Sequence, residues 1–536
     1  MSQRTFWTAL ALVAGMTVAG ATGAPPAAHA TGADHIANDT QWIDAAGDPI
    51  LAQGGNVQKV GATWYWVGSA LVAGQPKSIN LYSSTDLTNW TFVKSLVTQW
   101  SGTGTSPVPG DTAANDPAGD QFVSGQWLGR PQLIHNTAHH QWVLWAEVGS
   151  HTGAKGNAQA VFTTADDDIA GTYTLRSQPN DPALGNQDYL VQDQAGNLVT
   201  SGDRSVFVDG DNAYLVYVGD STTQRNQSVN IAPLDDTWTK VGAPIWTLPF
   251  GGQEAPGLVK VGTTYYLFAS GQKGWDPTQT VFKTSSTTLK GFPTAAGTWT
   301  PVTEAPSSGT QNSFATQFEQ IIPVTDSNGV VQSYLYNGDR YSEFADQAQV
   351  PGSLSGVGRN AFYPITFDGG TPKLFGATDV SVNASSGTLN WNRVVNGRFD
   401  MTGAINGKVP YWTSSGTSGA TTIAKRTGSN AQELVQTGTA FTSWNSQTIS
   451  LPNGSYRAQV WYRLAGTPQN AYLGIKANDV TNPSAEIRTA FTTGGSTFTT
   501  TTVDFSVTSG KVTIGSWIDA TGSATLETDA YSIWSR

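Results

Sequence analysis

Short runs in which apolar and polar residues alternate recur along most of the chain, and they predict strands. From Thr31 onward, runs rich in Tyr, Trp, Val and Thr are separated by clusters of Gly, Asn, Asp and Pro. Side chains of a strand point alternately to the two faces of a sheet, so such runs are typical of strands with one buried face. The period of 3.6 that marks an amphipathic helix is almost absent. We therefore expect an all-β protein.

An aromatic run returns five times, with copies that begin at Ala62, His140, Asn212, Thr264 and Gln332. Most copies are followed by a second apolar run and then by a short segment with Trp, Tyr or Phe. Radial repetition of one antiparallel sheet protects the sheet edges, and repeats of this length are typical of propeller blades. We expect a five-bladed β-propeller over residues 31–385.

The composition changes after Asn392, where the aromatic repeat stops and Thr and Ser become more frequent. Alternating strands over the remaining length favour a jelly-roll β-sandwich domain at residues 392–536. The run 455–463 places Trp461 among arginine and glutamine side chains on one face of a strand. A ring beside planar hydrogen-bonding groups suits a sugar, so we predict that Trp461 binds carbohydrate. A Trp that only protects the sandwich surface is the alternative.

The N-terminus has the features of a secretory signal peptide. Arg4 precedes an apolar stretch from Phe6 to Val18, and the small residues Ala28 and Ala30 suit cleavage after residue 30. We expect residues 1–30 to be removed and the mature protein to be secreted and extracellular. No later stretch approaches the roughly 18 consecutive apolar residues of a membrane-spanning helix, so we expect no membrane partner.

The composition narrows the partners and the chemistry. Charged residues make up only 12% of the chain, which has 59 Gly and 19 Trp, and this is typical of exported proteins that face carbohydrate. The net charge is −11 and there is no basic run, so we expect no nucleic-acid partner. The absence of Cys excludes disulfides and thiol nucleophiles. We expect a monomer, without a cofactor.

Polar residues just before the repeated runs are the candidates for chemistry, because the innermost strands of a propeller surround its channel. Glu254 enters the fourth copy between glycines and Ala-Pro, which suits a general acid. A partly buried glutamate beside another carboxylate keeps its proton at neutral pH, and Asp203 is the candidate for that carboxylate. The alternatives are a turn residue at Glu254 and, at Asp203, an Asx-turn or a salt bridge to Arg204.

Several segments of the repeat region occur together in one known family. They are Asp44 to Gly55, Arg130 with Pro131, Ser201 with Asp203, Glu254 to Pro256, Ser270 to Trp275, Gln317 with Pro323, and Gly338 to Arg340. Their combination resembles glycoside hydrolase family 43, and most closely its exo-β-1,3-galactanase group. The second region resembles jelly-roll carbohydrate-binding modules, which implies a structural calcium shared by Asp400 and Asp529.

The resemblance implies an inverting glycosidase in which Glu254 donates the proton and Asp203 orients it and adjusts its pKa. Most members use a third carboxylate as the base, whereas the galactanase group has a glutamine there, here Gln317. A neutral amide is a poor base, so Gln317 would position the water unless it reacts through its imidic tautomer. Glu319, two residues along the same side of the strand, is the alternative base.

The chain departs from the galactanase group at two positions that concern the sugar. The group usually has glutamates where this chain has Ser69 and Gly129. The matching segments make Arg130 and Asp339 candidates for substrate binding. Aromatic rings near the mouth suit stacking on a sugar, and the candidates are Trp127, Trp275 and Tyr341. Packing between blades is the alternative for each ring.

The sequence therefore predicts a secreted, inverting exo-glycosidase that acts on the β-1,3-galactan of arabinogalactan, a plant cell-wall polysaccharide. Two alternatives stay open. One is another activity of the same family, α-L-arabinofuranosidase or β-xylosidase. The other is a carbohydrate-binding propeller without catalysis.

Overall fold

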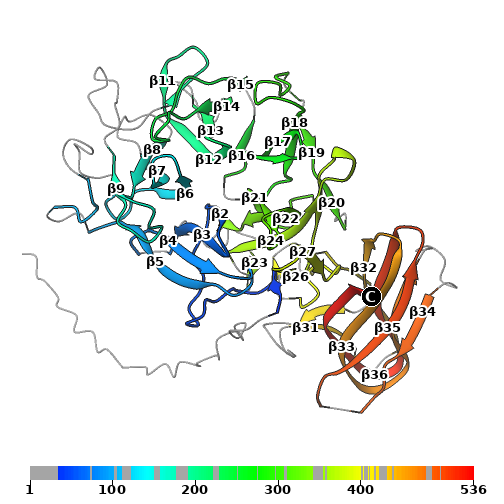
Figure 1. Ribbon diagram of the computed structural model, residues 1–536. Coiled ribbons are helices and arrows are strands. Elements are labelled where there is room, and N and C mark those ends of the chain that lie inside the picture. The colour runs from blue at the N-terminus through cyan, green and yellow to red at the C-terminus, as the bar shows by residue number, and fades with distance from the viewer. Residues whose placement is uncertain are drawn as a thin grey trace, which may run out of the picture.

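The described part of this computed structural model begins at Asp34 and ends at Arg536. Its regular structure is almost entirely strand, which confirms the expected all-β class (Figure 1). No helix of the described residues is long and apolar enough to cross a membrane. The predicted signal peptide, Trp275 and Asp400 lie outside the described residues. The internal segments outside it are 73–74, 102–104, 112–121, 150–156, 177–190, 221–227, 250–251, 275, 296, 298, 307–310, 342–353, 356–358, 400–401, 404–408, 410, 416–417, 422–430, 437–439, 478–485 and 495.

The first region forms successive groups of mostly antiparallel strands, which Figure 1 shows around a common centre. The first group is β2 (Val57–Val60), β3 (Thr63–Ala70), β4 (Ser78–Ser84) and β5 (Thr91–Thr98). The second is β6 (Leu128–Asn136), β7 (Gln141–Gly149), β8 (Asn157–Thr163) and β9 (Thr174–Leu175). The third is β12 (Ser201–Asp209), β13 (Asn212–Gly219), β14 (Ser228–Pro233) and β15 (Trp246–Pro249).

Two further groups follow in chain order. The fourth is β16 (Gln253–Val261), β17 (Thr264–Gly271), β18 (Val281–Ser285) and β19 (Thr300–Pro301). The fifth is β21 (Gln317–Thr325), β22 (Val331–Asp339), β24 (Asn360–Thr366) and β25 (Lys373–Phe375), with β20 (Thr303–Ala305) parallel to β25. Short pairs are β10 (Val191–Gln192) with β11 (Leu198–Val199), and β23 (Leu354–Ser355) with β28 (Thr402–Gly403).

The first strand of each group lies nearest the centre. The first strands of neighbouring groups contact one another, β6 with β12, β12 with β16, β16 with β21, and β21 with β2. Each first strand also pairs with the strand that carries the aromatic run, namely β3, β7, β13, β17 and β22. The polar segments that precede the aromatic runs in the sequence therefore surround the centre.

The two ends of the first region meet. Strand β1 (Ile36–Ala37) pairs with β26 (Asp379–Asn383), which in turn pairs with β27 (Thr388–Trp391). The amide of Asn38 reinforces this contact, because its Nδ2 donates hydrogen bonds to the carbonyl oxygens of Phe362 (2.9 Å) and Ala377 (3.0 Å). The start of the described chain is thus fixed beside the fifth group.

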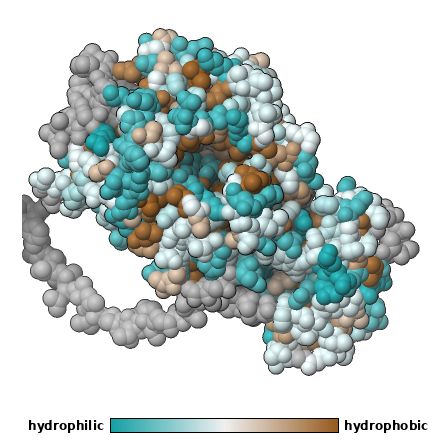
Figure 2. All heavy atoms as spheres, viewed as in Figure 1, coloured by the Kyte–Doolittle hydropathy of each residue, from teal (hydrophilic) through white to brown (hydrophobic). Residues whose placement is uncertain are grey.

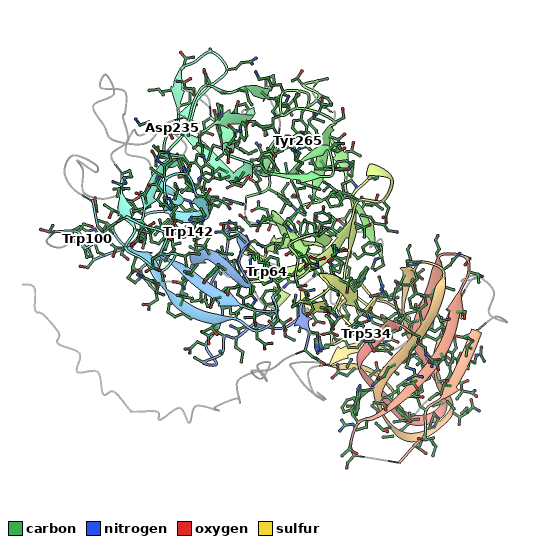
Figure 3. All side chains as sticks on the ribbon, in the orientation of Figure 1. Trp64, Trp100, Trp142, Asp235, Tyr265 and Trp534 are labelled. Carbon is green, nitrogen blue, oxygen red and sulfur yellow. The ribbon has the colours of Figure 1, made fainter. Side chains whose placement is uncertain are left out.

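The repeated aromatic run forms the core between groups. Trp66 is completely buried, and its ring centroid lies 5.3 Å from that of Trp90 and 5.2 Å from that of Phe362. Figure 3 labels Trp64, Trp142 and Tyr265, which belong to the aromatic strands of three different groups. Replacing such a buried Trp by Ala costs about 3–5 kcal/mol of stability, so these residues are chiefly structural.

The second region is built around two long strands, β33 (Gly454–Ala477) and β36 (Lys511–Ser535), which pair with each other along most of their length. The start of β33 pairs with β35 and with the end of β36, whereas its end pairs with β34 and with the start of β36. Gly466 (φ 84°) marks the bend between the two halves. The other strands are β29 (Thr413–Ser415), β30 (Ser418–Thr421), β31 (Ala431–Gln436), β32 (Phe441–Ser450), β34 (Glu486–Ala490) and β35 (Thr499–Val507).

Polar contacts join the two regions. Thr378 N of the first region donates to Val394 O (2.9 Å), and Arg398 Nη1 lies 3.0 Å from Asp39 Oδ1 at the start of the first region. Arg398 also pairs with Asp379 of β26. A separate hydrophobic cluster, from Val394 to Ile533, fills the sandwich. Among the described residues no group of three His, Cys, Asp or Glu could hold a metal, and Asp400 lies outside them, so the calcium stays a prediction.

Candidate active site

We call the end of the first region at which its innermost strands begin the mouth. The innermost strands change register at this end. Shifts occur between Gly129 and Gln132 in β6, between Ser201 and Arg204 in β12, between Glu254 and Gly257 in β16, and between Phe318 and Gln320 in β21. A bulge re-aims side chains that would otherwise alternate between faces. The candidate residues of four strands are thereby turned toward one another. Figure 2 shows the surface hollowed near the centre of the first region.

Glu254 lies at this mouth and is 7% exposed. Ala255 adopts a left-handed backbone conformation (φ 51°), so the chain turns sharply after the glutamate. Glu254 Oε1 accepts hydrogen bonds from Gln317 Nε2 (2.8 Å) and from Lys273 N (3.3 Å). Burial, together with the nearby charge of Asp203, raises the pKa of Glu254 to about 8. The carboxyl group therefore keeps its proton at neutral pH.

Asp203 is held next to Glu254 by two contacts. Its Oδ2 accepts a hydrogen bond from Ala255 N (2.9 Å), and its Oδ1 lies 2.7 Å from Arg130 Nε. The predicted alternative of a salt bridge to Arg204 is wrong, because Asp203 pairs with Arg130 and Arg204 Nε donates to the amide oxygen of Gln159. The sequence-based expectation that Asp203 stands beside Glu254 holds.

Arg130 of β6 joins candidate residues of two other strands, β12 and β21. Its Nε contacts Asp203, its Nη1 contacts Glu319 Oε2 (2.7 Å), and its Nη2 donates to Gln317 Oε1. The side chain is buried and lies over the ring of Tyr341, 5.4 Å from the ring centroid. Every guanidinium nitrogen thus has a protein partner. This geometry fits an organising residue better than the direct sugar contact expected from the sequence.

Gln317 has a fixed amide orientation, because its oxygen faces Arg130 and its Nε2 faces Glu254. Glu319 lies deeper. Its side chain is 1% exposed, and its Oε1 accepts a hydrogen bond from Gln132 Nε2 (3.3 Å) while Oε2 contacts Arg130. Burial raises the pKa of Glu319 well above its usual range. A base that must contact substrate water needs more access than this position offers.

Asp339 and Tyr341 form the floor on the side of the fifth group. Asp339 Oδ2 accepts a hydrogen bond from Gly54 N (2.8 Å), and burial raises its pKa to about 6. Tyr341 is 2% exposed, and a Cβ at Gly54 would lie 2.1 Å from its hydroxyl. The ring is therefore packed under Arg130 rather than open to a sugar, which differs from its predicted stacking role.

Trp127 lies at the mouth, half-buried, on the side of the second group. A Cβ at Gly129 would be 2.2 Å from Trp127 Cζ2, so the indole occupies the space that a side chain at position 129 would need. This explains physically why the chain has no glutamate there.

Trp461, in contrast, belongs to β33 of the second region.

Sequence reasoning missed Glu147 of β7. This residue stands directly opposite Gly129 in the sheet and is 2% exposed. Its Oε1 accepts a hydrogen bond from Asn157 Nδ2 (2.6 Å), and burial with the nearby charge of Asp203 raises its pKa. Glu147 could have been found by comparing the repeats. In each repeat, one residue of the aromatic strand lies opposite the residue at the mouth. These residues are Ser69, Glu147, Gly219, Ser270 and Asp339.

Comparison with known proteins places this arrangement in a structural class. No protein-family model matches the sequence, and no curated protein matches it. The exo-β-1,3-galactanase of Phanerochaete chrysosporium, solved with β-1,3-galactotriose, is similar with a TM-score of 0.52 and 21% identity, covering 92% of this chain and 100% of that one. The fold of the chain is therefore similar to that of this galactanase.

Two further solved structures are similar to the chain. An exo-β-1,3-galactanase from Clostridium thermocellum has a TM-score of 0.52 at 21% identity, over 79% of this chain and 91% of that chain. A GH43 β-1,3-galactosidase has a TM-score of 0.49 at 24% identity, over 64% of this chain and 63% of its own. The structural neighbours are thus exo-β-1,3-galactanases and β-1,3-galactosidases of family 43, as the sequence resemblance predicts.

Proposed function

We propose that the chain is an inverting exo-glycosidase that hydrolyses the β-1,3-galactan of arabinogalactan. The proposal is carried by Glu254, whose pKa is raised to about 8 beside Asp203 and which contacts Gln317 at the mouth. A general acid works best when its pKa is near the working pH. The similarity of the fold to two exo-β-1,3-galactanases supports this reaction and this sugar.

The contacts of Glu254 indicate which of its oxygens carries the proton. Both described donors, Gln317 Nε2 and Lys273 N, reach Oε1, so the acidic proton belongs on Oε2. From Oε2 the proton passes to the glycosidic oxygen as the bond from that oxygen to the anomeric carbon breaks. A water oxygen bonds to the anomeric carbon from the opposite face and loses its proton to solvent. The products are one sugar with inverted configuration and the shortened chain.

Gln317 must move relative to Glu254 for this reaction. An inverting site needs roughly 6.5–9.5 Å between the acid and the group that directs water, because the sugar and the water lie between them. In the structure Gln317 Nε2 is 2.8 Å from Glu254 Oε1. We propose that a sugar displaces the amide from Glu254 and that Arg130, which holds Gln317 Oε1, keeps it directed at the water.

One feature favours a second candidate for the sugar. Ser69 is buried and Gly129 lies under Trp127, so neither supplies the carboxylate that the galactanase group has at these positions. The absence of this pair keeps α-L-arabinofuranosidase and β-xylosidase activity as the second candidate. The first strands of the fourth and fifth groups, β16 with Glu254 and β21 with Gln317, would perform the same chemistry on either sugar.

A product assay tests the proposal. Purified protein is incubated with β-1,3-galactan, arabinan and xylan, and the released sugar is identified with its anomeric form by NMR. We expect galactose, released as the α-anomer from a β-linkage. Release of arabinose or xylose alone would replace the galactan proposal with the second candidate. Retention of configuration would refute the inverting mechanism, and no release from any polymer would refute catalysis.

The number of blades, the nature of the second region and the location of the protein are part of the same proposal. We propose that the five strand groups are the blades of a five-bladed propeller and that the second region is a jelly-roll carbohydrate-binding domain. The pairing of β1 with β26 supports closure of the ring. We further propose that the protein is secreted, after removal of residues 1–30, and acts as a monomer on polysaccharide outside the cell.

A further inference from the structure

Three aromatic residues stand in one cross-strand row on the second region. Trp444 of β32 lies directly opposite Trp517 of β36, and Trp517 lies directly opposite Tyr472 of β33. Their neighbours in sequence, such as Leu473 and Ile518, are completely buried in the sandwich core. Because strand side chains alternate between faces, the three rings share the outer face. We call this face, formed by β32, β36, β33 and β34, the aromatic face.

The rings of the aromatic face are half-buried rather than enclosed. The planes of Tyr472 and Trp517 are within 16° of parallel, with centroids 6.4 Å apart. The guanidinium of Arg488 lies 4.7 Å from the centroid of Tyr472 on the side of β34. Neighbouring strands lie about 4.8 Å apart, so a row across three strands offers aligned apolar surface about 10 Å long. That is the length of a short run of sugar rings.

Small and polar residues lie next to this row. Gly515 and Gly474 follow on β36 and β33 and carry no side chain to cover the rings. At Gly474 a Cβ would lie 2.3 Å from Glu486 Oε1, so the missing side chain leaves room for that carboxylate. Glu486 Oε2 is 2.8 Å from Arg488 Nε. Hydrogen-bonding groups are thus held beside the rings at the level of the sheet.

The aromatic face has charges of both signs, with Glu486 and Asp519 acidic and Arg488 and Lys476 basic. Glu486 pairs with Arg488, and on the other side of the row Asn470 Nδ2 donates to Asp519 Oδ2 (2.9 Å). A surface of this kind has donors and acceptors but no strong field of one sign. It complements a neutral, hydroxyl-rich chain, whereas an acidic peptide or a nucleic acid would need an excess of basic residues.

The opposite face of the sandwich, which includes Trp461, has a different character. The cross-strand neighbours of Trp461 are Thr500 and Asp529. The same face has the ion pairs of Arg457 with Asp504 and of Arg463 with Glu527. Arg457 and Arg463 are two of the planar groups beside Trp461 that the sequence assigns to sugar binding.

We propose that the aromatic face binds a neutral polysaccharide chain, with Trp517 at its centre, and that this chain is the galactan cleaved at the mouth. The identity of the sugar rests on the proposed function, whereas the binding surface does not. Rings present apolar faces to the C–H groups of a sugar, and Glu486, Arg488 and Asn470 meet its hydroxyls. The face would hold the polymer near the catalytic mouth and raise its effective concentration there.

Affinity electrophoresis of the full chain tests this proposal. All variants carry Glu254→Gln so that the polymer is not consumed, and gels contain β-1,3-galactan, arabinan, xylan or no polymer. We expect retardation by galactan that falls at least fivefold in Trp517→Ala and in Tyr472→Ala. The matched control is Trp461→Ala, on the opposite face of the same sandwich, which should migrate like the parent. Thermal unfolding and the milder Trp517→Phe separate lost binding from lost folding.

The outcomes distinguish the binding face from the catalytic proposal. Retardation by arabinan or xylan in place of galactan, with the same dependence on Trp517, supports the face and corrects the sugar of the proposed function. Retardation that is lost in Trp461→Ala and kept in folded Trp517→Ala overturns the proposal in favour of the opposite face. Parent protein that is retarded by none of the polymers overturns it entirely, even if the product assay shows hydrolysis.

Discussion

The mouth of the first region and the aromatic face of the second are both formed by residues at matching positions on adjacent strands. The mouth is suited to acid catalysis, whereas the aromatic face is suited to holding a polymer. At the mouth, bulged strand ends bring Asp203, Glu254 and Gln317 around one buried guanidinium, that of Arg130. On the aromatic face, regular strands keep their rings half in solvent. Acid catalysis needs a shifted pKa, which burial and a close charge produce. Holding a polymer needs open surface.

The backbone is irregular at the mouth and regular on the aromatic face. All four candidate strands of the mouth contain a register shift, and Arg130 and Ala255 have positive φ angles. The row Trp444, Trp517 and Tyr472 contains none. Strained backbone is retained where the surrounding structure holds it and where function needs a re-aimed side chain. A site for chemistry and a site for attachment can thus be told apart before any ligand is known.

The largest effect should come from Glu254→Gln. Because the variant cannot protonate the leaving oxygen, kcat on galactan should fall by roughly 10²–10⁴, while retardation in galactan gels is unchanged. The matched control is Glu304→Gln, another buried glutamate, whose pKa burial raises to about 7 and whose Oε1 accepts from Ser313 N (2.8 Å). It lies outside the mouth and should keep its activity. Near-normal turnover in Glu254→Gln would mean that the acid is another residue.

Arg130→Met should have the largest effect on stability. It leaves Asp203 without its ionic partner and removes the contact with Glu319, and removing one partner of such a buried pair costs about 3–5 kcal/mol in unfolding free energy. The control is Arg457→Met, which removes an exposed pair with Asp504 on the second region and should cost at most about 1 kcal/mol. Urea denaturation measures both. Equal losses would show that Arg130 is not the organising residue of the mouth.

The sequence was sufficient to predict the strands and their repetition, because these depend on local patterns of apolar and polar residues. The repeated aromatic runs correspond to the second strand of each group, and the polar segments before them correspond to the innermost strands. Asp203 and Glu254 were correctly predicted as neighbours, because they hold equivalent places in successive repeats. Their roles stay proposals until activity is measured.

What the sequence could not show depends on contacts between distant strands. Tyr341 resembles a stacking residue in the sequence, yet it is buried because Gly54 lets its hydroxyl approach the backbone. The aromatic row joins residues from three separate strands whose register only the folded sheet defines. Glu147, in contrast, could have been found by aligning the five repeats to Asp339. Trp275 lies outside the described residues and stays a prediction.

Asp203→Asn should change the pH profile more than the fold. The negative charge of Asp203 helps to raise the pKa of Glu254, so its removal lowers that pKa and Glu254 loses its proton at lower pH. The alkaline limb of kcat should therefore move down by about one pH unit or more. Asp209→Asn, on the same strand but paired with Lys260 (3.0 Å), is the control and should leave the limb in place. An unmoved limb in Asp203→Asn would assign Asp203 a structural role only.

The smallest effect should come from Gly129→Ala, which tests whether Trp127 serves the mouth as Trp517 is proposed to serve the aromatic face. A methyl group at position 129 would lie 2.2 Å from Trp127 Cζ2, so the half-buried indole must tilt away from its present place. If the ring stacks on a sugar, KM for galactan oligosaccharides should rise roughly threefold to tenfold, the worth of one aromatic contact, while kcat changes little. Gly522→Ala is the matched control, because a Cβ there meets nothing within 4 Å. A normal KM in Gly129→Ala, with the indole shown to be displaced by its fluorescence, would assign Trp127 to packing.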